Sequence, residues 1–332
     1  MKINILNKRV VILLSVALII FGGCVKNSTT TPPIAKPTVA QTIKSGTNLT
    51  LFNAALVRTG LDTVLNNPDS MVTVFVVTDL IMTQYGLGAS VIDTMNVGRL
   101  DTILLYHILP GEKILSANLI NGGTGQNVST QMASGDSVFI TYIDNALYVN
   151  GISVPTTDVN ASNGYLDVLA QPLFPPAGTI LQITQADTTL SFFDTAVALT
   201  ASATNNNIQT LLTSGNIYTV FVPNNNAFRN AGYSTVDTVN PNTLANFLSY
   251  HIIAGRYFTS DMSIALANPV LTIDDTTSQV TISTLPDSVI KVTLGLSYQV
   301  EGAADSVAAN LYAPNIMARN GVIHKIDRVL LQ

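Results

Sequence analysis

Hydrophobic residues recur at helical spacing in two segments of the chain, and both segments lead into the same three residues. The apolar positions are Leu100, Ile103 and Leu104 before His107, and Leu244, Phe247 and Leu248 before His251. Spacings of i, i+3, i+4 and i+7 place these side chains on one face of a helix. The pattern therefore predicts two equivalent amphipathic helices, each with a histidine on its buried stripe.

The two predicted helices have matching start and stop signals. Asn96 and Asn240 stand at equivalent N-cap positions, and Pro241 follows where a missing N–H costs nothing. We expect the helices to end at Pro110-Gly111 and at Ala254-Gly255.

Alternating segments rich in β-branched and aromatic residues predict strands. They cover residues 137–142, 146–149, 279–282 and 290–294. Turn residues at Asp144-Asn145 and Asn150-Gly151 favour antiparallel hairpins. Further helices are expected earlier, around residues 51–56 and 192–199. Helices followed by strands indicate an α+β domain and not alternating βαβ units.

Repeated sequences indicate that the chain is a tandem duplication. Tyr106-His107-Ile108 recurs as Tyr250-His251-Ile252, 144 residues later (251 minus 107). Residues 73–76 recur at 219–222, and residues 163–166 resemble 320–323, in the same order. Solenoid repeats have periods of roughly 20 to 50 residues, so this long period predicts two domains. We expect the domains at 41–176 and 177–332, joined by a linker that contains Pro172, Pro175, Pro176 and Gly178.

The first 40 residues predict export and a lipid anchor. Lys2, Lys8 and Arg9 precede an apolar run at 10–21, and Gly22-Gly23-Cys24 follows. This is the pattern of a signal peptide over residues 1–23, with Cys24 as the acylated residue of a bacterial lipoprotein. A signal-anchor helix is the alternative, but about 12 residues rising 1.5 Å each do not span about 30 Å of hydrocarbon. Residues 24–40 then form a Thr/Pro linker, which is expected to be extended and semi-rigid.

The composition limits the classes of function and of site that we expect. Charged residues make up 11% of the chain, hydrophobic residues 47%, and the net charge is −5, so we expect a folded protein with no basic face for nucleic acid. Cys24 is the only cysteine, which excludes an intrachain disulfide and a thiolate zinc site.

Three segments of the second copy resemble fasciclin (FAS1) domains: residues 218–228, 248–255 and 320–331. The resemblance implies two tandem FAS1 domains, each a twisted antiparallel β-sandwich with several packed helices, used as an extracellular adhesion or binding module. The first copy diverges, because residues 77–82 replace the 223–228 sequence. Its closing segment has Asp167, Ala170 and Gln171 where the second copy has His324, Asp327 and Arg328.

The resemblance also supplies candidate site residues. In some fasciclin proteins the Tyr-His pair is tied to receptor binding, which implies Tyr106, His107, Tyr250 and His251 as contacts, with His324 and Asp327 in the closing segment. The competing interpretation is that these residues hold the fold, because a histidine on an apolar stripe is usually buried and paired with backbone groups.

No catalytic, cofactor or metal motif is expected. The sequence lacks G-x-S-x-G, and Gly123-Thr124-Gly125 lacks the third glycine of a dinucleotide loop, so a surface loop is expected there. A site built from His107, His251 and His324 would need ligands from two domains. Residues 158–162 imitate the start of a calcium loop, but Asn163 and Leu169 stand where glycine and glutamate are required.

Asp followed by Ser or Thr recurs along the chain. It resembles the O-glycan acceptor sequence of Bacteroidetes envelope proteins, and the alternative is that Asp serves as a turn or N-cap residue. The sites are Asp62, Asp69, Asp93, Asp101, Asp136, Asp187, Asp194, Asp237, Asp275, Asp287 and Asp305.

Taken together, these patterns predict a lipid-anchored envelope protein, in the outer membrane, that mediates adhesion or recognition without catalysis. They leave open whether it faces the periplasm or the cell surface. The expected partner is a protein or glycan ligand on a cell surface or matrix. The alternative is a glycan-binding or substrate-handling accessory lipoprotein of an outer-membrane uptake system. A cluster of exposed aromatic residues would favour glycan capture.

Overall fold

The computed structural model describes residues 35–332 except 112–124, 144, 264–270, 275–278, 287 and 294–296. Residues 36–332 form one compact unit. The predicted signal peptide, Cys24 and most of the predicted linker lie outside the described residues. Among the helices that the structure describes, none combines the length and apolar character needed to cross a bilayer.

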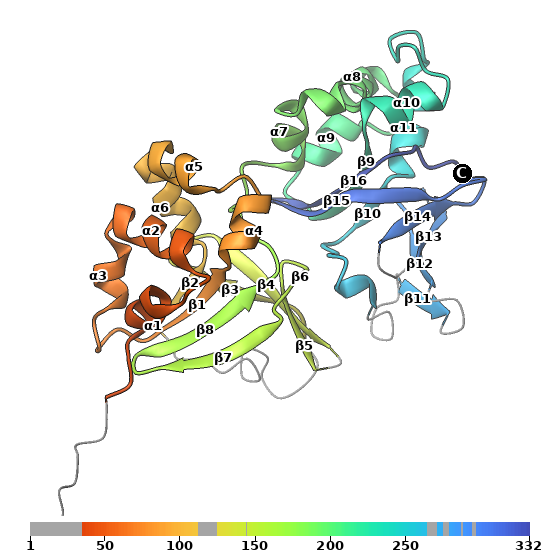
Figure 1. Cartoon of the computed structure of the whole chain (residues 1–332). Helices are drawn as coiled ribbons and strands as arrows, with labels where there is room; N and C mark the ends of the chain where they lie inside the picture. Colours follow the sequence, from red (N-terminus) through yellow and green to blue (C-terminus); the bar gives the residue numbers. More distant parts are fainter. Residues whose placement is uncertain are drawn as a thin grey trace, which may run out of the picture. The chain divides into compact units, whose positions relative to one another are not determined.

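The first repeat begins with helices and ends with strands (Figure 1). Its first helix starts at a capping box, in which Thr38 and Gln41 each bond the other's backbone N–H. The helices are α1 Val39–Ser45, α2 Thr50–Thr59, α3 Leu61–Leu65, α4 Asp79–Gln84, α5 Ala89–Thr94 and α6 Val97–Leu105. The strands are β1 Val72–Val77, β2 Ile108–Pro110, β3 Gly125–Gln131, β4 Ser137–Ile143, β5 Ala146–Val149, β6 Ile152–Ser153, β7 Thr156–Ala161 and β8 Gly164–Leu169.

The second repeat follows the same plan. Thr179 and Gln182 form the same capping box at its first helix. Its helices are α7 Ile180–Gln185, α8 Ser191–Leu199, α9 Ile208–Thr213, α10 Asn225–Asn230 and α11 Pro241–Ser249, with 3₁₀ turns η2 Thr188–Leu190, η3 Thr200–Ser202 and η4 Asp261–Ser263. Its strands are β9 Tyr218–Pro223, β10 Ile252–Ala254, β11 Leu271–Asp274, β12 Gln279–Ser283, β13 Val289–Thr293, β14 Gln299–Gly302, β15 Ala309–Ala318 and β16 Gly321–Ile326.

The sheets confirm the α+β prediction. The first repeat has two four-stranded sheets, in the orders β2-β1-β8-β7 and β3-β4-β5-β6. The second has one eight-stranded sheet, β10-β9-β16-β15-β14-β13-β12-β11, because β14 also pairs with β15. The predicted strands at 137–142, 146–149 and 279–282 are β4, β5 and β12, and residues 290–293 lie in β13. Asp144 and Leu294 lie outside the described residues.

The structure departs from the expected antiparallel pairing at one strand pair in each repeat. β1 pairs with β8 in parallel, with Thr73 opposite Tyr165, and β9 pairs with β16 in the same way, with Thr219 opposite Val322. A parallel pair needs a long crossover connection. The helices and hairpin strands between the paired elements supply that connection.

The predicted helix ends are also corrected. Helices α6 and α11 stop at Leu105 and Ser249, with Tyr106 and Tyr250 as C-caps. The next residues form the short strands β2 and β10, which pair with β1 and β9 and so take the backbone out of the helix. Gly111 and Gly255, both at positive φ, follow these strands and do not cap the helices. The Asn96 and Asn240 caps are confirmed.

Each repeat has its own hydrophobic core. One cluster of buried residues lies entirely within residues 39–173. Two others lie within residues 180–330. The hydrophobic clusters of one repeat therefore contain no side chain from the other.

The repeated Asn-Gly sequence joins the first helix of each repeat to its closing strand. Asn163 Oδ1 accepts the N–H of Val39 at 2.8 Å, and Asn320 Oδ1 accepts the N–H of Ile180 at 2.8 Å. A Cβ on Gly164 or Gly321 would lie 2.0 Å or 1.8 Å from a carbonyl oxygen of the neighbouring parallel strand. Glycine is therefore required where β8 and β16 begin.

Candidate functional site

The first Tyr-His pair is an internal anchor. His107 is buried, and its Nε2 accepts the backbone N–H of Leu173 at 3.0 Å. Its Nδ1 therefore carries the proton and donates to the carbonyl oxygen of Ile103 at 2.8 Å. The ring thus links the end of α6 to the segment that follows β8.

The second pair repeats this geometry. His251 Nε2 accepts the N–H of Leu330 at 3.0 Å, and Nδ1 bonds the carbonyl oxygen of Phe247 at 2.9 Å. Burial lowers the pKa of both His107 and His251 to about 4, since an imidazolium would lose its water. Both rings are neutral at physiological pH and have both nitrogens engaged.

The hydroxyl groups of Tyr106 and Tyr250 are also hydrogen-bonded within the protein. The hydroxyl of Tyr106 donates to the carbonyl oxygen of Ser137 at 2.8 Å and accepts from Asn150 Nδ2 at 3.0 Å. The hydroxyl of Tyr250 donates to the carbonyl oxygen of Val289 at 2.6 Å and accepts the N–H of Ala303 at 2.9 Å. Each tyrosine therefore joins the end of its helix to the hairpin strands of its repeat.

His324 and Asp327, in the closing segment of the second repeat, also form hydrogen bonds within the protein. His324 is buried and stacks on Phe221 at 5.3 Å between ring centroids. Its Nδ1 accepts the N–H of Asn315, and its Nε2 bonds the carbonyl oxygen of Tyr257 at 2.9 Å. Asp327 accepts both the backbone N–H and the side-chain amide of Asn310 at 2.7 Å. The structure brings none of these residues to a common cleft with the Tyr-His pairs.

Because these hydrogen bonds engage the polar groups of the motif residues, few of those groups remain free to bind a ligand or a metal ion. Within the described part of the chain, no group of three or more His, Cys, Asp or Glu side chains is placed to hold a metal ion. The segment that imitates a calcium loop forms part of β7 and the turn after it. Gly123 and Thr124 lie outside the described residues, and Gly125 begins β3.

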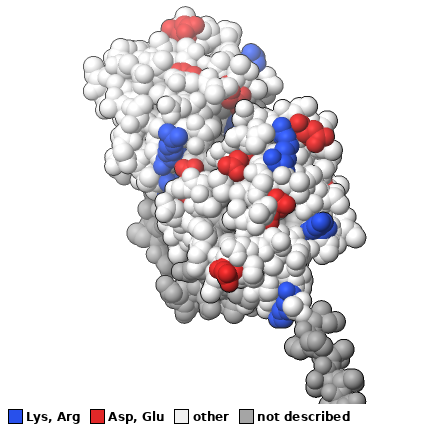
Figure 2. Space-filling view, turned by 90° about the vertical axis from the view of Figure 1, so that its left-hand side faces the viewer, with Lys and Arg blue, Asp and Glu red and all other residues white. Residues whose placement is uncertain are grey.

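Charge is sparse on the molecular surface. Figure 2 shows acidic and basic side chains scattered singly or in small mixed groups over the face in view. An ion pair joins Lys325 to Asp187. The same Asp187 accepts the N–H of Thr189 as N-cap of η2, so at this site the acidic residue has the capping role. Asp275 and Asp287 lie outside the described residues.

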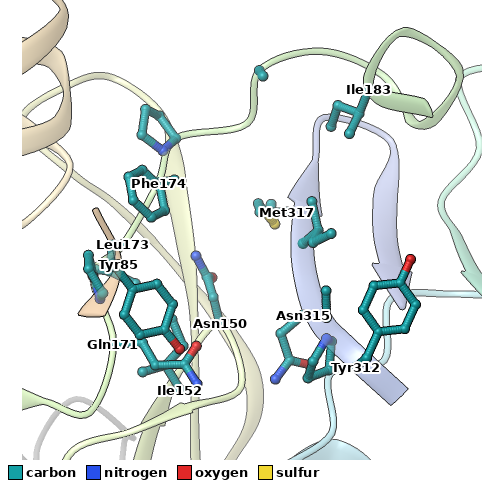
Figure 3. Close-up of a pocket in the computed structure, with 16 residues that line it drawn as sticks. Tyr85, Asn150, Ile152, Gln171, Leu173, Phe174, Ile183, Tyr312, Asn315 and Met317 are labelled. Carbon is teal, nitrogen blue, oxygen red and sulfur yellow. The ribbon is translucent and has the colours of Figure 1, made fainter. Parts of the chain in front are cut away.

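Sequence reasoning missed a pocket that residues of both repeats line (Figure 3). Its volume is about 430 Å³, and none of its sixteen lining residues is charged. Tyr85, Phe174 and Tyr312 lie at this pocket and are 43%, 44% and 47% exposed. They are the most exposed aromatic side chains of the described residues, and nothing in their local sequence shows that they meet.

Direct contacts also join the two repeats, and one of them involves Asn315 of the pocket lining. Thr141 Oγ1 donates to Asp261 Oδ1 at 2.7 Å, and Asn315 Nδ2 donates to the carbonyl oxygen of Gly151 at 3.3 Å. The guanidinium of Arg256 lies 4.2 Å from the centroid of the Phe139 ring. The pocket therefore depends on the docking of one repeat against the other.

Comparison with known proteins identifies the repeats. The fasciclin domain model matches residues 47–175 and 191–332. The chain is 29% identical over 154 residues to the uncharacterized protein sll1735 of a Synechocystis species, covering 46% of this chain and 96% of that protein. It is 25% identical over 239 residues to the transforming growth factor-beta-induced protein ig-h3 of Sus scrofa, covering 70% of this chain but only 30% of that protein.

A solved structure gives a further comparison. It is a FAS1 domain pair from the insect cell adhesion molecule fasciclin I, with 16% identity, a TM-score of 0.39, and coverage of 85% of this chain and 96% of that one. The family match alone spans more than half of the sequence and falls on both repeats. The chain therefore belongs to the fasciclin family and contains two FAS1 domains in tandem.

Proposed function

We propose that this protein is a lipid-anchored envelope protein that mediates adhesion or recognition through its two FAS1 domains and catalyses no reaction. FAS1 domains are known in adhesion proteins. The observation that carries the proposal is the engagement of both histidine nitrogens in each Tyr-His pair by backbone groups. These neutral, fully bonded rings stabilise the interior of each domain separately, which leaves recognition to the outer surface.

The proposed anchor is an acylated Cys24, followed by the Thr/Pro-rich linker up to residue 40. Acyl chains contribute about 0.8 kcal/mol for each buried CH₂ group, and more than one chain makes attachment stable. The linker would hold the folded unit away from the lipid surface. The outer membrane is the proposed location.

The tandem arrangement suits adhesion. Two linked binding modules that engage one surface raise the effective affinity without any new contact, provided that both reach it. Contacts such as that between Thr141 and Asp261 support a fixed spacing of the two domains. The gain in effective affinity would be largest for a partner surface that carries several copies of the ligand. The partner is proposed to be a protein or glycan of a cell surface or matrix.

Protease shaving of intact cells, followed by a crosslinking pull-down with the tethered protein, tests this proposal. We expect proteolysis of the exposed domains, crosslinked surface partners, and loss of adhesion in a deletion strain. Full protection from protease would exclude adhesion between cells. A Cys24→Ser variant should leave the detergent phase in a two-phase partition, which tests the anchor separately.

O-glycosylation of Ser or Thr after Asp is a further part of the proposal. The intact mass of protein from its native host measures it directly. An unmodified mass would remove the glycoprotein hypothesis without affecting the adhesion hypothesis.

A further inference from the structure

We propose that the pocket lined by Tyr85, Phe174 and Tyr312 binds a neutral saccharide, and that this is the ligand through which the protein adheres. The inference rests on the proposed adhesion function and names its ligand class. The three rings come from distant parts of the chain: the end of α4, the segment after β8, and β15. Their convergence at one concave site is the observation that carries the proposal.

The rings are available for a ligand. The other aromatic side chains whose burial the structure describes are buried or half-buried, but these three retain over two fifths of their surface. In Figure 3, Tyr85 and Phe174 lie on one side of the pocket, and Asn315, Met317 and Tyr312 lie across from them. Exposed rings present flat apolar faces, and the C–H face of a pyranose stacks on such a face.

Polar groups beside the rings suit hydroxyl-rich ligands. Among the described residues, no hydrogen-bond partner is found for the side-chain amide of Gln171 or for the hydroxyls of Tyr85 and Tyr312. Asn150 and Asn315 are already engaged by Tyr106, Thr259 and Gly151. The free groups can both donate and accept, as sugar hydroxyls require.

The charge and size of the site agree with this ligand class. Because none of its lining residues is charged, the pocket offers no ion pair to an acidic or basic ligand. Its volume of about 430 Å³ lies within the range of about 300–1,000 Å³ that is usual for small-ligand pockets.

Tyr312 lines a second concavity as well as this pocket, which favours an oligosaccharide. Tyr312 also lines this site of about 370 Å³, together with Thr188, Thr189, three consecutive asparagines and Arg229. The Arg229 guanidinium is already bonded to Asn226 and lies over the Phe192 ring. A chain of sugar residues could therefore run from the aromatic pocket onto a hydroxyl- and amide-rich surface.

A peptide fits the site less well. Strand β15 pairs with β14 only at Ala309 and Asn310, and the part that lines the pocket contains Pro314, which has no N–H with which to pair an added strand. Pro172, Pro175 and Pro314 line the pocket and have no N–H to bond a peptide carbonyl.

The test is a binding panel with the full-length chain in detergent. The probes are neutral gluco-, manno- and xylo-oligosaccharides, an oligogalacturonate as the acidic arm, and a proline-rich peptide as the protein arm. We expect a neutral oligosaccharide to bind, with saturation-transfer NMR contacts to aromatic protons. Calorimetry should show about tenfold weaker binding for Tyr312→Ala and for Phe174→Ala, which corresponds to the loss of one stacking contact.

Leu80→Ala is the matched control, because Leu80 is an exposed apolar residue that does not line the pocket. All three variants remove exposed side chains, so their melting temperatures should match that of the wild type. The inference is overturned if every neutral oligosaccharide fails to bind, if the pocket variants bind as well as the control, or if only the peptide or the acidic probe binds.

Cell adhesion assays separate this inference from the proposed function. Adhesion that persists in Tyr312→Ala cells but disappears in the deletion strain would overturn the saccharide pocket and keep the adhesion role. Measured saccharide binding with unchanged adhesion in the deletion strain would overturn the adhesion role.

Discussion

Asp167 occupies the position in the first repeat that His324 occupies in the second, and each accepts a hydrogen bond from a residue of positive φ. The N–H of Asp158 (φ 61°) donates to Asp167 Oδ1 at 2.7 Å, and the N–H of Asn315 (φ 62°) donates to His324 Nδ1 at 3.2 Å. The imidazole uses its second nitrogen on Tyr257. Asp167 Oδ2 is buried and has no partner among the described residues.

An Asp167→Asn variant should be more stable than the wild type at pH 7.5. Burial raises the pKa of Asp167 from 3.8 to about 6, so its stabilising contribution is present at low pH and lost as the pH rises through 6. Asparagine avoids a buried negative charge, and we expect a gain of about 1–3 kcal/mol in the free energy of unfolding at pH 7.5. Urea unfolding at pH 7.5 and pH 5 measures it, and the gain should shrink at pH 5.

Asp69→Asn is the control for that experiment, because Asp69 is exposed. A variant at Asp167 that is less stable than the wild type at pH 7.5 would show that the carboxylate is bonded in solution.

The second repeat should be the more sensitive to acid. Burial lowers the pKa of His251 and His324 to about 4, against 6.5 in the unfolded chain. The folded protein favours the neutral form of these two histidines. The free energy of unfolding that each contributes is therefore fully present above pH 6.5 and is lost as the pH falls toward 4, by up to about 3 kcal/mol for each group. In the first repeat, His107 acts in the same sense, but Asp167 acts in the opposite one.

Hydrogen exchange measured by mass spectrometry at pH 7 and pH 4.5, corrected for the intrinsic rates, resolves the two repeats. Protection should be lost first over residues 218–223 and 321–326. Earlier loss over residues 72–77 would contradict the assignment of these protonation states.

A His251→Ala variant should lose stability before it loses binding. The change leaves the N–H of Leu330 and the carbonyl oxygen of Phe247 unpaired in a buried site, and it also opens a cavity. We expect a cost of about 3 kcal/mol or more, visible as a lower melting temperature. Arg328→Ala, at an exposed site beside the same segment, is the control. Lost adhesion with an unchanged melting curve would instead make His251 a contact residue.

Gly321→Ala should abolish folding of the second repeat. The new Cβ would lie 1.8 Å from the carbonyl oxygen of Tyr218, in a central parallel pair that cannot move apart without losing its hydrogen bonds. Gly88→Ala is the matched control, since a Cβ there meets nothing within 4 Å and the residue has a φ of −69°. Soluble yield and circular dichroism distinguish the two. A stable, well-folded Gly321→Ala protein would contradict the described register.

The predictions that the structure confirms depend on residues that lie close together in the sequence. The Asn96 and Asn240 caps depend on residues within one turn of the helix, so spacing alone reveals them. The repeat of Tyr106-His107 at Tyr250-His251 likewise marks two copies of one core. The helix ends were misplaced because the short strands β2 and β10 exist only through pairing with distant strands.

Features that depend on distant parts of the chain were not predictable in this way. The sequences of β8 and β16 do not fix the direction of their partner strands, so the parallel pairs were missed. Tyr85, Phe174 and Tyr312 show no pattern as a set along the sequence. Only folding brings them to one pocket.

The attachment of Val39 to Asn163 has a mechanical consequence. The carbonyl oxygen of Pro37 also accepts the N–H of Ser162, and the Thr38 hydroxyl bonds Asn66. A pull on the chain at residue 36 would therefore reach the start of β8 directly, beside its parallel partner β1. Force would load these two strands together, so the helices need not unwind before the strands bear the load.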